Sequence, residues 1–341
     1  MSSPRGPVPS IAGPPHGRDL PAPDEPQGPF LPATGATQQP AADVSRETSD
    51  EFDTPIGDAA ERAMQVLHST HNRLRRPHNR RLITIANQKG GVGKTTTAVN
   101  LAAAIAIQGL KTLVIDLDPQ GNASTALGIT ERHSGTPSSY EVLIGEIPLH
   151  AALRRSPHSE RLFCVPATID LAGAEIELVS MVARENRLWT ALTELDSFDF
   201  DFVFIDCPPS LGLLTINALV AAPEVLIPIQ CEYYALEGVT QLMSNIEMVK
   251  AHLNPHLEVT TVILTMYDGR TKLADQVAEE VRRYFGGKVL RTVIPRSVKV
   301  SEAPGYGMTI IDYDPGSRGA MSYLDASREL AEHDQASSAE G

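Results

Sequence analysis

The sequence predicts a doubly wound α/β domain, with a mostly parallel sheet and helices on both of its faces. Short, almost wholly apolar segments alternate with helical segments from Leu82 onward, a glycine-rich loop follows the first apolar segment, and carboxylates end two others. Strands that are apolar throughout are typical of parallel sheets covered on both faces. Ligands of such sheets bind at the carboxyl ends of the strands, so functional residues are expected there.

The expected strands are short apolar runs, and the expected helices lie between them. We expect strands over residues 82–87, 112–116, 202–206, 225–229, 260–266 and 289–294. We expect helices over residues 95–108, 171–195, 236–252 and 274–285. Gly109 ends the first of these helices, as glycine commonly does.

The residues before this domain differ from it in composition. Residues 1–53 are rich in Pro, Gly, Ser, Thr and Ala, which predicts a disordered extension because too little apolar surface is available for burial. Residues 54–81 are expected to form a short helix with one apolar face, followed by a basic linker. Packing on the domain and docking of a partner, such as a polar scaffold, both explain that face. The domain itself is expected over residues 82–333, with a flexible acidic tail over 334–341.

Charge and cysteine content exclude several classes of protein. The net charge of −13 is incompatible with a uniformly basic nucleic-acid binder, so any contact with DNA must come from a few grouped cations. Cys164, Cys207 and Cys231 lie far apart and form no metal-binding pattern, which favours a reducing, cytoplasmic location. The longest apolar stretch, residues 213–231, is interrupted by two prolines and a glutamate, so no membrane span is predicted.

The strongest pattern is the segment NQKGGVGKTT over residues 87–96, which follows the first expected strand and opens the first expected helix. Glycines allow backbone N–H groups to curve around an anion, and the start of the helix adds favourable partial charge. Lys94 is placed to reach the β- and γ-phosphates, and the Thr95 hydroxyl to ligate Mg²⁺. We therefore predict an ATP and Mg²⁺ site whose phosphate-binding residues are Lys89, Gly90, Gly91, Val92, Gly93, Lys94, Thr95 and Thr96.

This loop departs from the usual P-loop pattern at its first position. Gln88 stands where the first glycine is usual, and a second lysine, Lys89, precedes the glycines. An additional cation beside other positive charge is explained if it neutralises phosphate. That phosphate would belong either to its own subunit or to a neighbouring one.

Carboxylates end two further strands. Asp206 ends the apolar segment 202–206, as a Walker B acid that holds Mg²⁺, often through water. Asp116 ends the strand over 112–116 and Asp118 follows directly after it, and either of them is suited to orient an attacking water. Asp116 is also a candidate for a further Mg²⁺ ligand. Together with the glycine-rich loop, these acids predict hydrolysis of ATP to ADP and phosphate.

These segments resemble the deviant Walker A ATPases of the MinD/ParA superfamily, and specifically the ParA/Soj family of chromosome-partitioning ATPases. The resemblance covers residues 82–330. It rests on KGGVGKTT (89–96), DLDPQGN (116–122) and IDCPPS (205–210), and on the C-terminal pieces IPR (294–296), SEAP (301–304), YDP (313–315) and SRGA (317–320).

The resemblance assigns roles to residues at matching positions. It implies that Lys89 crosses an ATP-bound homodimer to the partner's phosphates, that Asp118 activates water, and that Asp206 is the Walker B acid. The implied catalytic residues are therefore Lys89, Lys94 and Asp118. Gly90 matches a position where two subunits approach too closely for a side chain.

The resemblance also implies partners and a location. Non-specific binding of double-stranded DNA is assigned to Arg270, Arg296 and Lys299. These three residues are explained equally well as ordinary charged residues of a solvated surface. A ParB-type centromere-binding protein is expected to stimulate hydrolysis, so that the protein segregates chromosome origins on the cytoplasmic nucleoid.

Related ATPases of other function fit the sequence less well. A MinD-like protein would need a basic amphipathic helix at the C-terminus, whereas this tail is acidic, so no membrane attachment is expected. An iron–sulfur carrier would need bridging cysteines, and a plasmid-type partition protein would need an N-terminal helix-turn-helix domain. The sequence shows the pattern of neither. An ATPase that positions protein cargo on the nucleoid would use the same chemistry, and the sequence leaves this alternative open.

Overall fold

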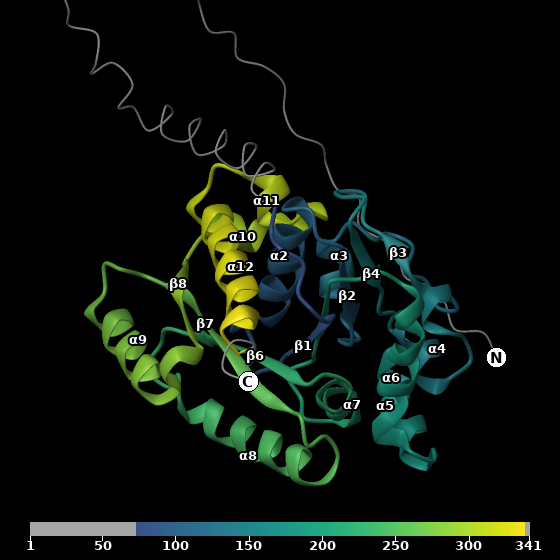
Figure 1. Cartoon of the computed structure of the whole chain (residues 1–341). Coiled ribbons are helices and arrows are strands. Elements are labelled where there is room, and N and C mark those ends of the chain that lie inside the picture. Colours follow the sequence, from purple (N-terminus) through teal and green to yellow (C-terminus); the bar gives the residue numbers. More distant parts are fainter. Residues whose placement is uncertain (1–72, 338–341) are drawn as a thin grey trace, which may run out of the picture. The chain divides into compact units, whose positions relative to one another are not determined.

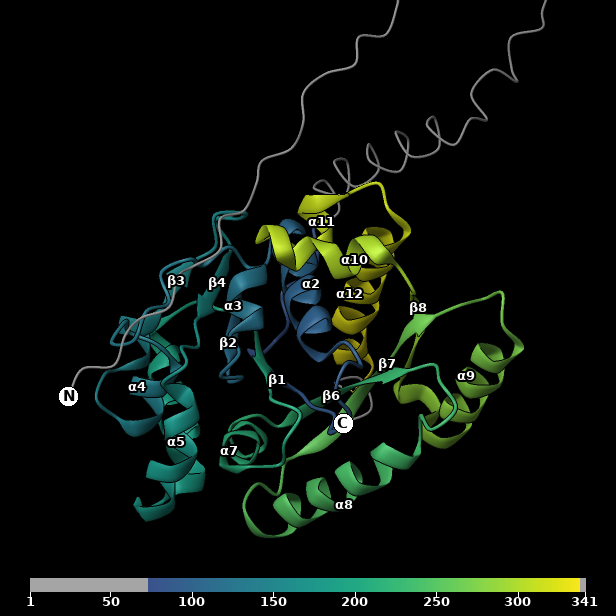
Figure 2. The same cartoon turned by 180° about the vertical axis from the view of Figure 1, so that it is seen from behind.

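The computed structural model describes residues 73–337 (Figures 1 and 2). The predictions of a disordered segment over 1–53 and of a helix after it lie outside these residues. The described part of the expected linker, residues 73–80, contains neither helix nor strand. No helix of the described region has the length and apolarity needed to cross a bilayer.

One eight-stranded sheet organises the domain, with strand order β3-β4-β2-β5-β1-β6-β7-β8. All neighbouring strands are parallel except β3 and β4, which are antiparallel. The strands are β1 Arg81–Ile85, β2 Thr112–Asp116, β3 Arg154–Arg155, β4 Leu162–Val165, β5 Phe202–Asp206, β6 Glu224–Gln230, β7 Glu258–Tyr267 and β8 Val289–Pro295. The predicted mostly parallel, doubly wound α/β fold is therefore confirmed.

Helices cover both faces of this sheet. Figures 1 and 2 show α2 and α12 side by side on one face and α7, α8 and α9 on the other. The helices are α2 Lys94–Ile107, α3 Asn122–Ala126, α4 Ser139–Ile144, α5 Leu171–Glu177, α6 Arg187–Leu192, α7 Leu213–Ala221, α8 Glu237–His252, α9 Lys272–Phe285, α10 Val298–Glu302, α11 Ile310–Tyr313 and α12 Arg318–Ser337.

The central strands are buried on both faces, which explains their apolar sequences. In β5, Phe202 and Phe204 pack in the core beneath α2 and α12, whereas Val203 and Ile205 pack in the core beneath α4 to α7. A third cluster joins β6 and β7 to α8 and α9. Alternate side chains of a strand point to opposite faces, so a strand covered on both sides needs apolar residues throughout.

The expected helix over residues 171–195 is broken. The chain forms α5, leaves helical geometry at Met181, passes through Ala183 at φ 53°, and resumes in α6. Asn217 of α7 stabilises the break, because its side chain donates 2.8 Å to the Arg184 carbonyl and accepts 3.1 Å from the Leu188 N–H. Apolar residues around the break suggested a continuous helix, yet Val182 is 90% exposed.

Further differences lie in elements of weak or uniform pattern. β3 and β4, which form one edge of the sheet, and α7, which is buried nearly all round, were assigned to no element from the sequence. Helix α12 extends to Ser337 and so includes the first residues of the expected flexible tail over 334–341.

Candidate functional site

Strand register brings the predicted acidic residues to the mouth of the glycine-rich loop. Asp206 at the end of β5 pairs with Ile85 at the end of β1 on one side and with Asp116 at the end of β2 on the other. The loop over residues 86–93 leaves β1 at this same edge and enters α2. Three segments far apart in the sequence thus meet at the carboxyl ends of neighbouring strands.

The loop curves through two left-handed glycines. Gly91 has φ 75° and Gly93 has φ 89°, conformations that other residues rarely adopt. The Asn87 side chain fixes the start of the loop, because it donates 2.8 Å to the Pro228 carbonyl and accepts 3.0 Å from the Lys89 N–H. The end of the loop is fixed by Thr265, whose hydroxyl donates 2.8 Å to the Val92 carbonyl. The N–H groups at the start of α2 are thereby held at the curve of the loop.

Lys94 is buried and directed across this loop. Its side chain ammonium donates 3.2 Å to the Lys89 carbonyl, and the residue is only 7% exposed. Burial lowers the pKa of Lys94, while Asp206 opposes this shift. A buried cation beside the N–H groups of a loop is suited to receive a polyanion, which would favour the charged form of the amine.

Asp206 is fully buried, and neither of its carboxylate oxygens has a hydrogen-bond partner among residues 73–337. Burial raises the pKa of Asp206 well above its usual range, and Asp116 raises it further. The Thr95 hydroxyl, although outside hydrogen-bond geometry, opposes this shift. Two orphaned carboxylate oxygens beside a threonine hydroxyl fit a divalent cation.

The described residues contain no cluster of three or more His, Cys, Asp or Glu side chains able to hold a metal. Mg²⁺ does not need such a cluster, because it usually binds one or two protein oxygens together with phosphates and water. One threonine hydroxyl and one carboxylate, as found together at Thr95 and Asp206, match this requirement.

Both carboxylate oxygens of Asp116 accept hydrogen bonds from neighbouring protein groups. One carboxylate oxygen accepts 3.1 Å from the Asp118 N–H, and the other accepts from the N–H and hydroxyl of Ser124 at 2.8 and 2.6 Å. Burial raises the pKa of Asp116 to about 6, and the Ser124 hydrogen bonds oppose this shift. These contacts favour a role in holding the turn after β2 over the role of metal ligand.

Asp118 lies on that turn and is half-buried. Its Oδ1 accepts 2.9 Å from the Gln120 N–H, and its carbonyl accepts 2.8 Å from the Gly121 N–H. Asp118 also favours the charged form of Lys94, so the two charges face the same region. The orientation of the Asp118 carboxylate is thus set by the main chain of a tight turn.

Lys89, in contrast, pairs with an acidic residue outside the loop. Its ammonium lies 3.7 Å from a carboxylate oxygen of Glu232, and its side chain is 37% exposed. Gln230 orients Glu232 by donating 2.6 Å to the other carboxylate oxygen. This ion pair joins residues distant in the sequence, so no local pattern could have revealed it.

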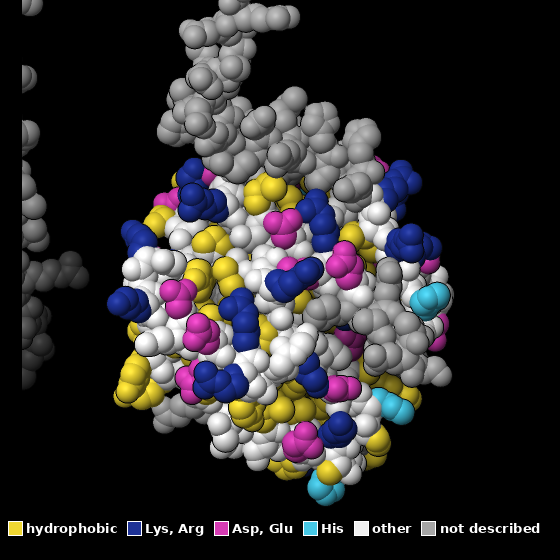
Figure 3. Space-filling model, turned by 60° about the vertical axis from the view of Figure 1, so that its left-hand side comes forward, with side chains coloured by type: hydrophobic (Ala, Val, Ile, Leu, Met, Phe, Trp, Pro, Cys, Tyr) yellow, Lys and Arg dark blue, Asp and Glu magenta, His cyan; other side chains and the backbone are white. Residues whose placement is uncertain are grey.

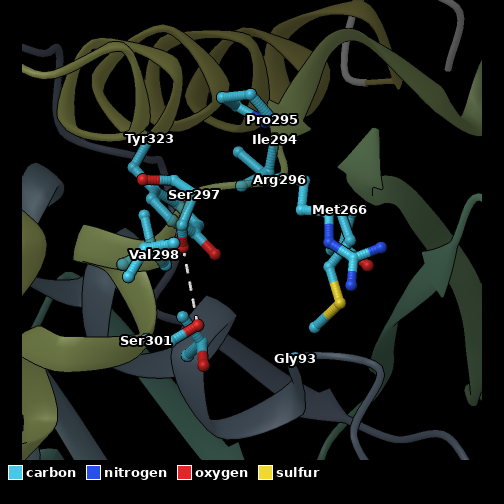
Figure 4. Close-up of a pocket in the computed structure, with 12 residues that line it drawn as sticks. Gly93, Met266, Ile294, Pro295, Arg296, Ser297, Val298, Ser301 and Tyr323 are labelled. Carbon is cyan, nitrogen blue, oxygen red and sulfur yellow. Dashed lines mark hydrogen bonds between the residues drawn. The ribbon is translucent and has the colours of Figure 1, made fainter. Parts of the chain in front are cut away.

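A cavity of about 300 Å³ adjoins the loop where Gly93 and Thr96 begin α2. Figure 4 shows the Met266 side chain directed toward the loop that carries Gly93, with Pro295 and Val298 on other walls. Met266 has φ 51°, an uncommon conformation for a residue other than glycine. No sequence pattern predicted this cavity, although Pro295 belongs to the IPR segment that carried the resemblance.

A second cavity of about 780 Å³ continues from the first and is lined by three arginines, Arg270, Arg296 and Arg318, which we call the basic rim. Two of these were predicted from the sequence, and the third starts α12 within the SRGA segment. Lys299 does not line this cavity; it pairs with Asp314.

Arg270 is bound by its own acidic neighbour. Its guanidinium donates to both carboxylate oxygens of Asp268, at 2.8 and 2.7 Å, and it lowers the pKa of Asp268 to about 2. Figure 3, which brings forward the side of β8 and α9, shows Lys and Arg side chains interspersed with Asp and Glu. The basic residues therefore do not form one continuous patch on that face.

Comparison with known proteins places this geometry in a family. A family profile described as an AAA domain matches residues 80–259. The chain is 53% identical over 251 residues to the sporulation initiation inhibitor protein Soj of Bacillus subtilis, covering 74% of this chain and 98% of Soj. It is 52% identical over 254 residues to the chromosome partitioning protein ParA of Myxococcus xanthus, covering 74% of this chain and 89% of ParA.

Solved structures share the fold. Cobyrinic acid a,c-diamide synthase of Mycobacterium smegmatis, with bound ADP and magnesium, is 38% identical with a TM-score of 0.65 and covers 76% of this chain and 97% of its own. The cell division ATPase MinD of Pyrococcus furiosus is 26% identical with a TM-score of 0.61 and covers 74% and 98%. Taken with the glycine-rich loop and the aligned carboxylates, the sequence relatives show that this chain belongs to the ParA/Soj family of chromosome-partitioning P-loop ATPases.

Proposed function

We propose that this protein is a partition ATPase, which dimerises on binding ATP, binds DNA non-specifically and hydrolyses ATP to release it. One observation carries the proposal: both carboxylate oxygens of buried Asp206, at the mouth of the loop that holds Lys94, have no hydrogen-bond partner within the described part of the chain. Such an arrangement is costly unless a cation and an anion complete it.

The loop and its neighbouring cavity divide the nucleotide between them. The phosphates are bound by the backbone of residues 89–96 and by Lys94, while the base lies in the cavity between Met266 and Pro295. Thr95 and Asp206 would hold Mg²⁺, with Asp206 acting through water. When bound, the ion would neutralise charge on the β- and γ-phosphates.

Asp118 orients the water that attacks the γ-phosphate. The water oxygen forms a bond to phosphorus, the bond to the bridging oxygen breaks, and the products are ADP and inorganic phosphate. Half-burial and a carboxylate held by the Gln120 N–H suit Asp118 to hold one water in one orientation.

Lys89 and the glycines after it fit a contact with a second copy of the chain. A Cβ atom at Gly90 or Gly91 would meet no described atom within 4 Å, so the described chain does not crowd either position. A partner subunit would supply the missing constraint at Gly90. Lys89 would then exchange Glu232 for the partner's phosphates, which carry more negative charge than one carboxylate.

Dimerisation would also create the DNA-binding surface. The rim arginines and Lys299 are few, and Arg270 and Lys299 are paired with Asp268 and Asp314, so one copy binds phosphates weakly. Two copies roughly double the counterions released on DNA, which raises the affinity and steepens its salt dependence. A ParB-type protein would trigger hydrolysis, reopen the dimer and release it, so that chromosome origins move along the nucleoid.

The relatives favour partitioning over the activity of the diamide synthase. The Soj and ParA relatives described above are 53% and 52% identical, whereas the synthase is 38% identical. The synthase structure is described with ADP and magnesium, so it supports the nucleotide site without extending its own reaction to this chain.

The decisive experiment compares Lys89→Ala with a matched control, Lys288→Ala. Both lysines are partly exposed, at 37% and 41%, and both pair with a glutamate on the surface. Full-length proteins would be tested for nucleotide binding, light-scattering mass with ATP and Mg²⁺, and binding to random-sequence duplex DNA between about 50 and 200 mM salt.

We expect wild type and Lys288→Ala to dimerise and to bind DNA only with ATP. Lys89→Ala should bind nucleotide as a monomer and lose DNA binding. DNA binding by Lys89→Ala at wild-type strength would refute the coupling. A wild-type protein that neither hydrolyses ATP nor binds DNA in its presence would refute the proposed function.

A further inference from the structure

The turn that carries Asp118 is clamped from outside by an arginine of the following loop. Arg132 donates 2.7 Å to the Thr125 hydroxyl, and that hydroxyl in turn donates 3.0 Å to the Gly121 carbonyl. Gly121 ends the tight turn with φ 64°, and its N–H donates 2.8 Å to the Asp118 carbonyl. A chain of three hydrogen bonds therefore links Arg132 to Asp118.

Gly121 provides the space that this contact needs. A Cβ atom at position 121 would lie 1.9 Å from an Arg132 side-chain nitrogen, so the guanidinium occupies the place of the missing side chain. The left-handed backbone favours glycine here, and any side chain at this position would displace the Arg132 guanidinium. The turn and the arginine are thus packed as one unit.

Arg132 is itself held by a well-anchored loop. Ser134 and the Gly135 N–H donate 2.9 and 3.3 Å to the two carboxylate oxygens of Asp170, directly before α5. Arg132 takes part in none of the ion pairs found over residues 73–337. No carboxylate therefore competes with the turn for its guanidinium.

We propose that Arg132 is a positioning residue for hydrolysis, fixing the turn through Thr125 and Gly121 so that Asp118 stays oriented. The inference rests on the proposed ATPase function. It concerns the rate of the chemical step alone, because Arg132 touches neither the phosphate loop nor the neighbouring cavity. Loss of orientation lowers a rate without weakening substrate binding.

The test uses the full chain with Arg132→Ala, Arg132→Lys, Thr125→Val and Thr125→Ser. Arg154→Ala is the matched control, because Arg154 is also half-buried and bonds only to carbonyls of its own segment. The measurements are kcat, nucleotide Kd, and hydrogen exchange of the backbone amides of residues 118 and 120–125 without nucleotide.

We expect kcat to fall about 10- to 100-fold in Arg132→Ala and Thr125→Val, with the Kd for ATP changed less than about twofold. The double variant should be no worse than either single one, since both remove the same chain of contacts. Arg132→Lys and Thr125→Ser should have kcat values between those of the disruptive variants and wild type. The control Arg154→Ala should keep the wild-type kcat.

Three results would overturn the positioning role: an unchanged kcat in Arg132→Ala, an equal loss in Arg154→Ala, or a loss confined to nucleotide affinity. Should wild type hydrolyse no ATP, the proposed function fails and amide exchange decides this inference separately. Exchange over residues 118–125 should then still be faster in Arg132→Ala, and unchanged exchange would refute the clamp.

Discussion

The phosphate loop and the basic rim lie next to each other but are built in opposite ways. At the loop, Lys94 and Asp206 are buried; Lys94 is the first residue of α2, and Asp206 is the last residue of the packed strand β5. At the rim, the Arg270 side chain is 88% exposed and is held by Asp268. A buried charged group is already oriented before the ligand binds. A single exposed charged group adds little binding energy, so an exposed surface needs several of them.

This difference predicts how each region responds to substitution. Removing one buried group should abolish a function, because nothing nearby can replace it. Removing one exposed cation should change an affinity by a small factor, because water and salt screen its contribution.

The largest expected effect is that of Lys94→Ala. It removes the buried cation that faces the phosphates and should weaken ATP binding about 100-fold, as expected for loss of a charge-assisted hydrogen bond. Isothermal titration with a non-hydrolysable ATP analogue measures this. Binding within a few-fold of wild type would show that the backbone of the loop suffices.

Asp118→Ala should affect ATP hydrolysis without affecting ATP binding. We expect nucleotide affinity to be kept and the hydrolysis rate to fall about 100-fold, trapping the ATP-bound dimer. Single-turnover phosphate release measures the rate, and DNA retention in ATP reports the trapped state. Normal turnover would remove Asp118 from the mechanism.

Asp268→Asn tests whether the rim is restrained by its own acid. It frees Arg270 from a carboxylate and removes one negative charge, so DNA affinity in ATP should rise about two- to fivefold. Arg318→Ala should lower the affinity by a similar factor and reduce the slope of the salt dependence by about one. Unchanged binding in both variants would move the DNA surface away from this cavity.

The smallest expected effect is that of deleting residues 1–50. The segment has no apolar periodicity, so the melting temperature should shift by less than about 2 °C and basal hydrolysis should be kept. Differential scanning fluorimetry and a phosphate assay measure both. A large fall in melting temperature would show that the segment packs on the domain.

Burial also determines which elements could be predicted from the sequence. Strands over 112–116 and 202–206 coincide with β2 and β5, because burial on both faces leaves an uninterrupted apolar sequence. The break after α5 was missed, since it depends on Asn217 from a distant helix. Apolar residues there follow a helical pattern although several are exposed.

The parts of the candidate site that could be predicted are those formed by residues close together in the sequence. The loop residues and the strand-end acids stand in short motifs, and register alone brings them together. The pairing of Lys89 with Glu232 and the filling of the space at Gly121 by Arg132 are tertiary contacts. Arg318 had a signal, since it lies in a segment used for the resemblance, but its place beside Arg270 required the fold.

The alignment of β1, β2 and β5 constrains where the chain can change in length. Each of these strands has five residues, and their last residues, Ile85, Asp116 and Asp206, are neighbours across the sheet. Deleting one residue within β5 would turn Asp206 to the opposite face and move it from the loop. Insertions and deletions during evolution should therefore accumulate in the connections, such as residues 156–161 between β3 and β4, and spare these three strands.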